Sequence, residues 1–306
     1  MTGKAEAADR AESGMFAELK AIDLPIISFP GARMYTRLMK RDHRSAPVRK
    51  LVALGESNGF GMCAGDPRNE WVQALANLIR DFQDEPLSVE NNSVPGSVIS
   101  PRSPGYPGLP EGSLPSALER FEGDLIGPGP DLAVVAFGLN DSRCGNPVGQ
   151  FVEDLETIVA ETQRRTSALV VVTSPYWNTQ YNPGLWKLHR PSWADDPTWA
   201  AFTREGDALV KSYVAEMRKL AERRSCLFVD LYGLTEDCLW LMNDDQCHFN
   251  DVGHRVIGQA VFNTIAASCS FLGRKSVRQA REAGLDVTNT GGTSSTSRMV
   301  QYWLHR

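Results

Sequence analysis

The sequence lacks the features that mark several specialised classes of protein. Its six cysteines form no C-x-x-C pair and no zinc-ligand spacing with the five histidines, which argues against a disulfide framework and a structural zinc motif. No window approaches the ~18 apolar residues of a membrane-spanning helix. Residues Met1 to Lys20 contain no apolar stretch of the kind found in a secretory signal. We therefore expect a cytoplasmic protein without a membrane span.

An excess of positive charge is also lacking. The 306 residues include 32 Lys+Arg and 37 Asp+Glu, a net charge of −5. The densest basic cluster, residues 41–50, is interrupted by Asp42 and Pro47, so no basic stripe is available to bind nucleic acid. Otherwise, 42% hydrophobic and 23% charged residues are ordinary for a globular protein. The expected partner is a small molecule, and the sequence carries no indication of the oligomeric state.

Five apolar runs alternate with amphipathic stretches along the chain. The runs are predicted as strands and the stretches as helices from their lengths and periodicities. The predicted strands are Lys50–Leu54, Pro86–Glu90, Asp131–Phe137, Ala168–Thr173 and Cys226–Leu231. The predicted helices are Trp71–Phe82, Leu114–Ile126, Phe151–Arg165, Trp199–Arg224 and Gly253–Ser268. Strands joined through helices pair in parallel, so we predict an α/β protein with three layers, α/β/α, around a parallel sheet of about five strands.

Three segments fall outside this alternation. Residues 1–48 are predicted to be an N-terminal extension, residues 49–272 the main domain, and residues 273–306 a C-terminal tail. The Thr/Gly/Ser-rich run from Thr288 to Ser297 is expected to make part of the tail mobile. The stretch from Pro95 to Pro115 is rich in proline and glycine, which predicts a loop at the edge or the carboxyl end of the sheet.

Polar residues follow the predicted strands at the carboxyl ends, where open parallel sheets bind ligands. Ser57 lies in a tight turn after the first strand, Gly96 follows a proline after the second, and Asn140 follows the third. Such a serine offers a hydroxyl and a backbone N–H, a Pro-Gly turn lets the backbone approach a ligand, and an asparagine amide can donate to an oxyanion. Helix capping and ordinary turns are the alternative roles for these positions.

Asp245 and His248 are the candidate acid and base. The three-residue spacing lets the carboxylate bond one imidazole nitrogen while the other nitrogen faces outward. Such a pair fixes the tautomer of the ring and stabilises the imidazolium formed when a serine loses its proton. Asp244 and His254 are the rival acid and base, although a capping or helix-surface role is expected for His254 at the start of the last helix.

Together these residues resemble the SGNH (GDSL-type) hydrolase family. Four blocks occur in the family's order: Ser57 of Gly-Glu-Ser, Gly96, Asn140 of Gly-Leu-Asn-Asp, and the D-x-x-H of Asp245 and His248. The resemblance implies a flavodoxin-like fold and a catalytic triad of Ser57, His248 and Asp245, with no metal or organic cofactor. It also implies an oxyanion hole from the Ser57 N–H, the Gly96 N–H and the Asn140 side chain.

The resemblance covers about residues 49 to 270 and departs from the family's pattern in the first block. The usual Gly-Asp-Ser is Gly-Glu-Ser here, and Asn58 replaces the usual Leu. Glu56 is one methylene longer than Asp and is not a triad member, so a shifted turn contact is expected rather than lost catalysis. The same letters match the G-x-S-x-G elbow of the α/β-hydrolases, but only about 50 residues precede the serine, too few for the strands that such a fold places before its elbow.

An aromatic segment before the longest predicted helix is the expected substrate wall. It holds four of the seven tryptophans of the chain. We expect Trp177, Trp186 and Trp193 to bind substrate, because flat aromatic faces among polar groups suit sugar rings or an amphipathic ester. A loop that merely packs against the domain is the alternative.

The expected activity is that of a serine esterase that forms an acyl-enzyme. The Pro/Gly-rich and polar loops promise few apolar walls, so we expect a short acyl group, acetyl first, on a carbohydrate or another polar alcohol. The alternatives are an O-acyltransferase with the same triad, a lipase-like or thioesterase-like acyl hydrolase, and a non-catalytic module that binds a small ligand at the same strand ends.

Overall fold

The computed structural model describes residues 42–83, 85–106, 115–179 and 207–273. In this part of the chain, five strands form one parallel sheet in the order β2-β1-β3-β4-β5. The strands are β1 (Lys50–Gly55), β2 (Ser88–Asn91), β3 (Leu132–Ala136), β4 (Leu169–Thr173) and β5 (Leu227–Val229). The predicted parallel sheet of about five strands is therefore confirmed.

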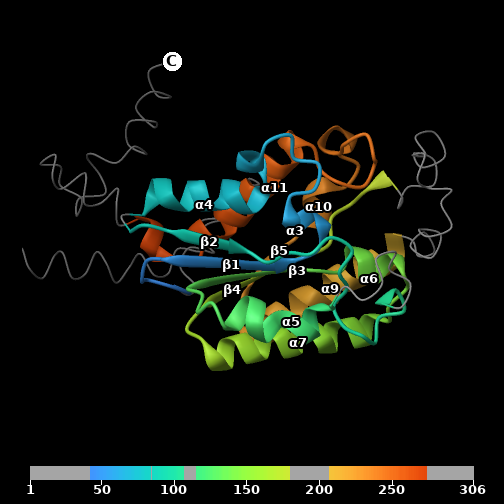
Figure 1. Cartoon of the computed structure of the whole chain (residues 1–306), viewed down its shortest axis with the longest axis horizontal. Helices are drawn as coiled ribbons and strands as arrows, with labels where there is room; N and C mark the ends of the chain where they lie inside the picture. The colour runs from blue at the N-terminus through green and yellow to red at the C-terminus, as the bar shows by residue number, and fades with distance from the viewer. Residues whose placement is uncertain (1–41, 84, 107–114, 180–206, 274–306) are drawn as a thin grey trace, which may run out of the picture. The chain divides into compact units, whose positions relative to one another are not determined.

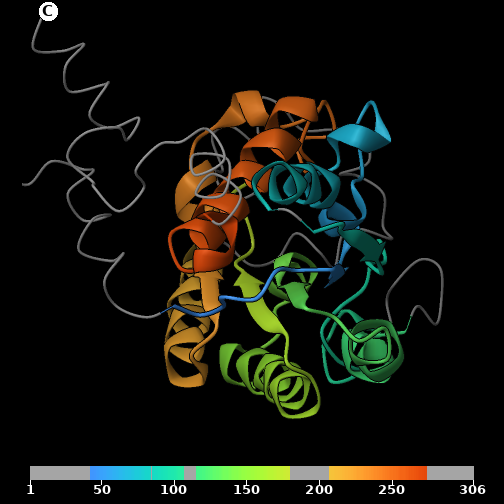
Figure 2. The same ribbon diagram turned by 90° about the vertical axis from the view of Figure 1, so that its left-hand side faces the viewer.

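Helices cover both faces of the sheet (Figure 1; Figure 2). On one face, α4 packs against α11, and on the other α7 packs against α9 and α5. These helices are α4 (Trp71–Phe82), α11 (Asp251–Ala266), α5 (Ala117–Phe121), α7 (Val148–Arg165) and α9 (Asp207–Arg224). The arrangement confirms the predicted α/β/α class.

Alternate residues of the strands belong to two apolar clusters, one on each face of the sheet. In β1, Leu51 belongs to the cluster that contains Trp71 of α4, whereas Val52 belongs to the cluster that contains Phe151 of α7. Phe151 stacks on Tyr213 of α9, with ring centroids 4.3 Å apart. Burial on both faces explains why the strands are continuous apolar runs rather than alternating patterns.

The strand order creates a switch point between β1 and β3. From β1 the chain moves outward to β2 on one side, and it then crosses to β3 and continues through β4 to β5 on the other. This is the order of flavodoxin-like sheets, in which the loops leaving the two central strands diverge and open a crevice for ligands. The loops at this point are those that carry Ser57 and Asn140.

Short helices that the sequence pattern does not reveal lie just beyond the strands. They are α3 (Ser57–Phe60), α6 (Leu139–Arg143) and α10 (Leu231–Thr235), each too short for a hydrophobic period to appear. The last predicted strand accordingly ends at Val229 instead of Leu231. The reason is Asp230, which caps α10 by accepting a hydrogen bond from the Gly233 N–H (2.8 Å).

Other predicted helices differ in extent. The predicted helix Leu114–Ile126 consists of α5 followed by one π-helical turn, η3 (Glu122–Ile126). Glu119 marks its start by accepting a hydrogen bond from the Ser116 N–H (2.8 Å). Helix α7 begins three residues before its predicted start, directly after Pro147. Single 3₁₀ turns are η1 (Pro67–Asn69), η7 (Leu239–Leu241) and η8 (Ser270–Gly273).

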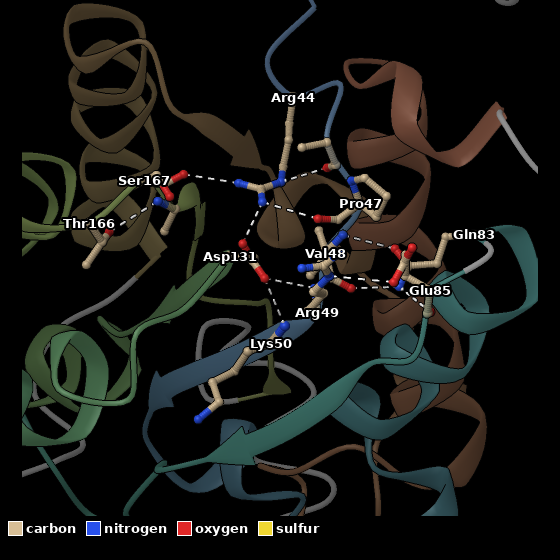
Figure 3. Close-up of polar contacts among 12 residues, drawn as sticks. Arg44, Pro47, Val48, Arg49, Lys50, Gln83, Glu85, Asp131, Thr166 and Ser167 are labelled. Atoms are coloured by element: carbon tan, nitrogen blue, oxygen red, sulfur yellow. Dashed lines mark hydrogen bonds and ion pairs between the residues drawn. The ribbon is translucent and has the colours of Figure 1, made fainter.

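A polar network ties the amino ends of three strands together (Figure 3). Arg44 forms an ion pair with Asp131 (2.6 Å) and donates to the carbonyl oxygen of Ser167 (3.1 Å). The second carboxylate oxygen of Asp131 accepts from the N–H groups of Arg49 (2.9 Å) and Lys50 (3.2 Å). These contacts hold the starts of β1, β3 and β4 relative to one another.

The predicted N-terminal extension and C-terminal tail lie almost entirely outside the described residues. The Pro/Gly-rich segment is described from residue 95 to residue 106, where it contains no α-helix and no strand, as predicted. Among the helices that the structure describes, none combines the length and the apolar character needed to cross a membrane.

Candidate active site

The turn after β1 places Ser57 at the first residue of α3. Position 55 is tightly packed, because a Cβ atom there would lie 3.0 Å from the carbonyl oxygen of Ala136 in β3, and glycine avoids this contact. The indole N–H of Trp71 donates to the carbonyl oxygen of Asn58 (2.8 Å) and holds the turn from the side of α4. Ser57 is 7% exposed, so the turn presents this hydroxyl from a nearly buried and well-fixed position.

Ser57, His248 and Asp245 are hydrogen-bonded in series. The Oγ atom of Ser57 lies 2.8 Å from Nε2 of His248, and Nδ1 of the same ring lies 2.5 Å from Oδ2 of Asp245. The other oxygen of Asp245 accepts from the N–H groups of Cys247 (3.0 Å) and His248 (2.9 Å). An antiparallel bridge between Met242 and Phe249 closes the loop that carries both residues. The carboxylate is therefore held against the ring by its own loop.

Asp245 and His248 shift each other's pKa in the direction that favours the charged forms. Burial opposes ionisation of Asp245, but the hydrogen bond and charge of His248 outweigh burial and lower the pKa of Asp245 to about 2. Burial also opposes the imidazolium, yet Cys247 and the Asp245 carboxylate raise the pKa of His248 above its usual range. An ionised Asp245 can only accept, so Nδ1 carries a proton. In the neutral ring, Nε2 is then free to accept the proton of Ser57.

The Gly96 turn and the Asn140 side chain lie together. Within the turn, the Ser97 N–H donates to the carbonyl oxygen of Val94 (3.1 Å). Gly96 has a φ of +78°, the left-handed value that the third residue of a type II turn requires and that glycine adopts without strain. The Asn140 Nδ2 donates to the carbonyl oxygen of Ser97 (3.0 Å). The Asn140 side chain is thus bonded to the residue that follows Gly96 in this turn.

Glu56 links the serine turn to Asn140. Its carboxyl group accepts hydrogen bonds from the N–H groups of Leu139 (2.8 Å) and Asn140 (3.0 Å). Burial raises the pKa of Glu56 to about 8, an effect that the Asn140 N–H opposes and the charge of Asp141 increases. The side chain of Glu56 therefore contacts the start of α6. The sequence shows an acid next to Ser57, but it does not show the hydrogen-bond partners of that acid, which lie 83 and 84 residues away in the chain.

A match to a known family agrees with this geometry. The GDSL-like lipase/acylhydrolase family matches residues 53–256, two thirds of the chain. The chain belongs to this family. It is accordingly an enzyme that hydrolyses ester bonds, and the matched residues include Ser57, Gly96, Asn140 and the Asp245–His248 segment.

Solved structures share the fold of this GDSL-like enzyme. A lipase/acylhydrolase from Enterococcus faecalis has a TM-score of 0.53 and 21% identity, over 71% of this chain and 95% of that chain. An acetyl-xylooligosaccharide esterase from Geobacillus stearothermophilus has a TM-score of 0.51 and 17% identity, over 73% and 96%. LAE5, a hydrolase from the metagenome of Lake Arreo, has a TM-score of 0.52 and 21% identity, over 74% and 98%. No curated protein sequence is significantly similar to this chain.

The rival acid and base of this GDSL-like enzyme lie apart from the Ser57 series. Asp244 is exposed, whereas its neighbour Asp245 faces the imidazole. His254 is fully buried, which corrects the helix-surface role expected for it. Its Nε2 lies 3.0 Å from the carbonyl oxygen of Met62. His254 therefore ties α11 to the segment that follows α3.

Only one of the three tryptophans predicted to bind substrate is described. Trp177 is 2% exposed and belongs to the apolar cluster that contains Trp71. It packs in the core and offers no open aromatic face, which corrects the prediction for this residue. Trp186 and Trp193 lie outside the described residues, so the predicted aromatic wall rests on them.

Cys63 is a further neighbour of the Ser57–His248–Asp245 series, and its sequence context does not indicate this position. Its Sγ atom lies 3.6 Å from Oδ2 of Asp245. The two residues are 182 positions apart, so no local spacing could have indicated the contact. Among the residues that the structure describes, Cys63, Asp245 and His248 form a group whose ligand atoms, all within 4.8 Å of one another, could hold a metal ion.

Proposed function

We propose that this enzyme is a serine esterase in which Ser57 is the nucleophile, His248 the general base and Asp245 the acid that orients it. The observation that carries the proposal is the 2.8 Å contact between Ser57 Oγ and His248 Nε2, with Asp245 on the other side of the ring. As Ser57 Oγ bonds to the ester carbonyl carbon, its proton passes to Nε2. His248 then returns that proton to the leaving alcohol, and water attacks the acyl-enzyme by the same route.

The oxyanion is proposed to be bound by the Ser57 N–H, the Gly96 N–H and the Asn140 amide. The turn geometry of Gly96 and its link to Asn140 through Ser97 support this proposal. So do the two hydrogen bonds from Glu56, which hold the start of α6 in place before any charge develops. Fixed donors aimed at developing charge are worth most when they need no rearrangement during the reaction.

The proposed substrate is a short-chain ester, acetyl first, on a carbohydrate or another polar alcohol. Polar side chains are buried at and near the proposed site: Asn58 lies in the serine turn, and Asn140 donates to the carbonyl oxygen of Ser97. The name of one structural relative, an acetyl-xylooligosaccharide esterase, is in keeping with this substrate class. Trp186 and Trp193 are proposed to contact the alcohol side.

A second candidate, an acyl hydrolase for longer chains, is favoured by one specific observation. The apolar side chains of Phe60 and Met62 are 51% and 40% exposed. Met62 also donates its backbone N–H to the carbonyl oxygen of Ser57 (3.1 Å). Exposed apolar side chains this close to the nucleophile could support an acyl chain, each buried methylene contributing about 0.8 kcal/mol.

A nitrophenyl ester series from acetyl to octanoyl tests both candidates on the same protein. The proposal predicts that kcat/KM falls from acetyl to octanoyl, and that Ser57→Ala loses several orders of magnitude of activity. Ser212→Ala, an exposed serine of α9, is the matched control. A fluorophosphonate probe should label wild type and Ser212→Ala but not Ser57→Ala. Activity of Ser57→Ala within about tenfold of wild type would contradict the nucleophile assignment, and kcat/KM rising through octanoyl would favour the second candidate.

A further inference from the structure

A thiol, a carboxylate and an imidazole meet at the edge of the proposed active site. Cys63 follows α3, whereas Asp245 and His248 come from the loop before α11. The Oδ2 atom of Asp245 is shared, lying 3.6 Å from Cys63 Sγ and 2.5 Å from His248 Nδ1. All three residues are partly exposed. Sulfur, carboxylate oxygen and imidazole nitrogen are the donor atoms with which proteins bind zinc.

The spacing of the donor atoms can be compared with that around a tetrahedral zinc ion. Bond lengths of ~2.3 Å to sulfur and ~2.0 Å to oxygen set these two ligands about 3.5 Å apart, close to the 3.6 Å between Cys63 Sγ and Asp245 Oδ2. A nitrogen and an oxygen on the same ion stand about 3.3 Å apart. The His248 ring therefore needs to move outward by about 0.8 Å from its 2.5 Å hydrogen bond.

We propose that Cys63, Asp245 and His248 form an inhibitory site for Zn²⁺. The ion takes the place of the proton that Asp245 and His248 share, with water as its fourth ligand. Cys63 gives the site its selectivity, because a thiolate favours zinc over the hard cations Mg²⁺ and Ca²⁺. The buried thiol of Cys247 lies 3.9 Å from the other ring nitrogen, Nε2, on the side of the ring that faces Ser57.

The inhibition follows from where the protons go. The Cys63 thiol releases its proton to solvent as the Zn–S bond forms. The Nδ1 nitrogen of His248 gives up its proton to bind the ion, so a neutral ring carries its proton on Nε2 instead. Nε2 then donates rather than accepts, and it cannot take the proton of Ser57. This consequence rests on the proposed function, whereas the binding itself does not.

Binding and inhibition are to be measured separately on tag-free protein kept reduced with a phosphine. Zinc uptake is followed by competition with a chromophoric zinc indicator, and activity by hydrolysis of nitrophenyl acetate in zinc-buffered solution. Wild type and Ser57→Ala should each bind one equivalent. Cys63→Ser should bind at least about tenfold more weakly, because a hydroxyl is a much poorer zinc ligand than a thiolate. Cys238→Ser, which changes a partly exposed thiol elsewhere, should bind as wild type does.

Zinc should also inhibit wild type and Cys238→Ser at the concentrations at which it binds. Cys63→Ser, compared with its own zinc-free rate, should need at least about tenfold more zinc, and Mg²⁺ should have no effect. Equal zinc affinity in wild type and Cys63→Ser would overturn the site, and binding without inhibition would overturn its inhibitory role. If wild type binds zinc through Cys63 but hydrolyses no ester, the zinc site stands and the esterase proposal is contradicted. If Cys63→Ser loses its native circular dichroism, Cys63→Ala takes its place in every comparison.

Discussion

Glu56 gives the enzyme a pH-dependent stability that one substitution should remove. The pKa of this buried carboxyl is raised from 4.5 to about 8. The unfolded chain therefore loses the proton at a lower pH than the folded chain does, and folding stability falls as the pH rises from about 4.5 to about 8. A shift of 3.5 units corresponds to about 5 kcal/mol over the whole range. Glu56→Gln cannot ionise, so this loss should disappear.

The loss of stability caused by Glu56 is best measured between pH 6 and pH 9. Burial also raises the pKa of Asp141, to about 6, so its contribution falls mainly below that value. For a carboxyl whose pKa shifts from 4.5 to about 8, linkage gives a loss of roughly 3 kcal/mol in folding stability between pH 6 and pH 9. Every other group that titrates in this pH range is present in both proteins, so its contribution cancels in the difference between wild type and Glu56→Gln.

Urea unfolding followed by tryptophan fluorescence measures the two pH profiles. The glutamine loses one backbone hydrogen bond to α6, a constant offset of about 1–3 kcal/mol that does not change with pH. Only the slopes are therefore compared. Glu222→Gln, at an exposed position of α9, should keep the slope of wild type. Parallel profiles for wild type and Glu56→Gln between pH 6 and pH 9 would refute the reasoning.

Substitutions around Ser57 should separate the remaining roles. Asp245→Asn should lower kcat by about 10³- to 10⁴-fold because the tautomer of the ring is lost, while Asp244→Asn should have little effect; a reversed ranking in steady-state assays would move the acid role to Asp244. Asn140→Ala should lower kcat by about 10²- to 10³-fold with little change in KM, and an effect on KM alone would make Asn140 a substrate-positioning group. His248→Ala should be about as damaging as loss of the serine. His254→Ala should instead destabilise the fold by about 1–3 kcal/mol in urea unfolding and spare kcat, and the opposite pattern would exchange the two histidines.

The sheet could be predicted because its strands are buried on both faces. A run such as Ala168–Thr173 is apolar at nearly every position, and helical stretches of 12 or more residues separate it from its neighbours. Parallel strands in that arrangement leave few topologies open. The positions of Ser57, Asn140 and the Asp245–His248 pair followed from the same logic, since the residues after each strand meet at one edge of the sheet.

What the sequence did not reveal depends on contacts between distant segments. Trp177 has the residue type of a sugar-binding platform, but only its packing against the core shows that it is unavailable. His254 has the position of a surface cap, yet Met62, from 192 residues earlier in the chain, covers it. Cys63 is an ordinary free thiol in the sequence, and only the fold brings it to Asp245. Composition and spacing carry no information about such pairs.

The two buried acids beside Asn140 carry a stability cost that their positions explain. Asp141 accepts from the N–H of Ile99 (3.0 Å), and Glu56 accepts from the N–H groups of Leu139 and Asn140. Apolar side chains of the same size would avoid the cost of burying an ionisable group, but they would leave these N–H groups without acceptors. The two acids therefore lower the folding stability at neutral and alkaline pH, but their hydrogen bonds hold these segments in a fixed geometry. Through them, the serine turn, the start of α6 and the segment after Gly96 are joined into one unit, so a shift in any of the three segments would be transmitted to the other two.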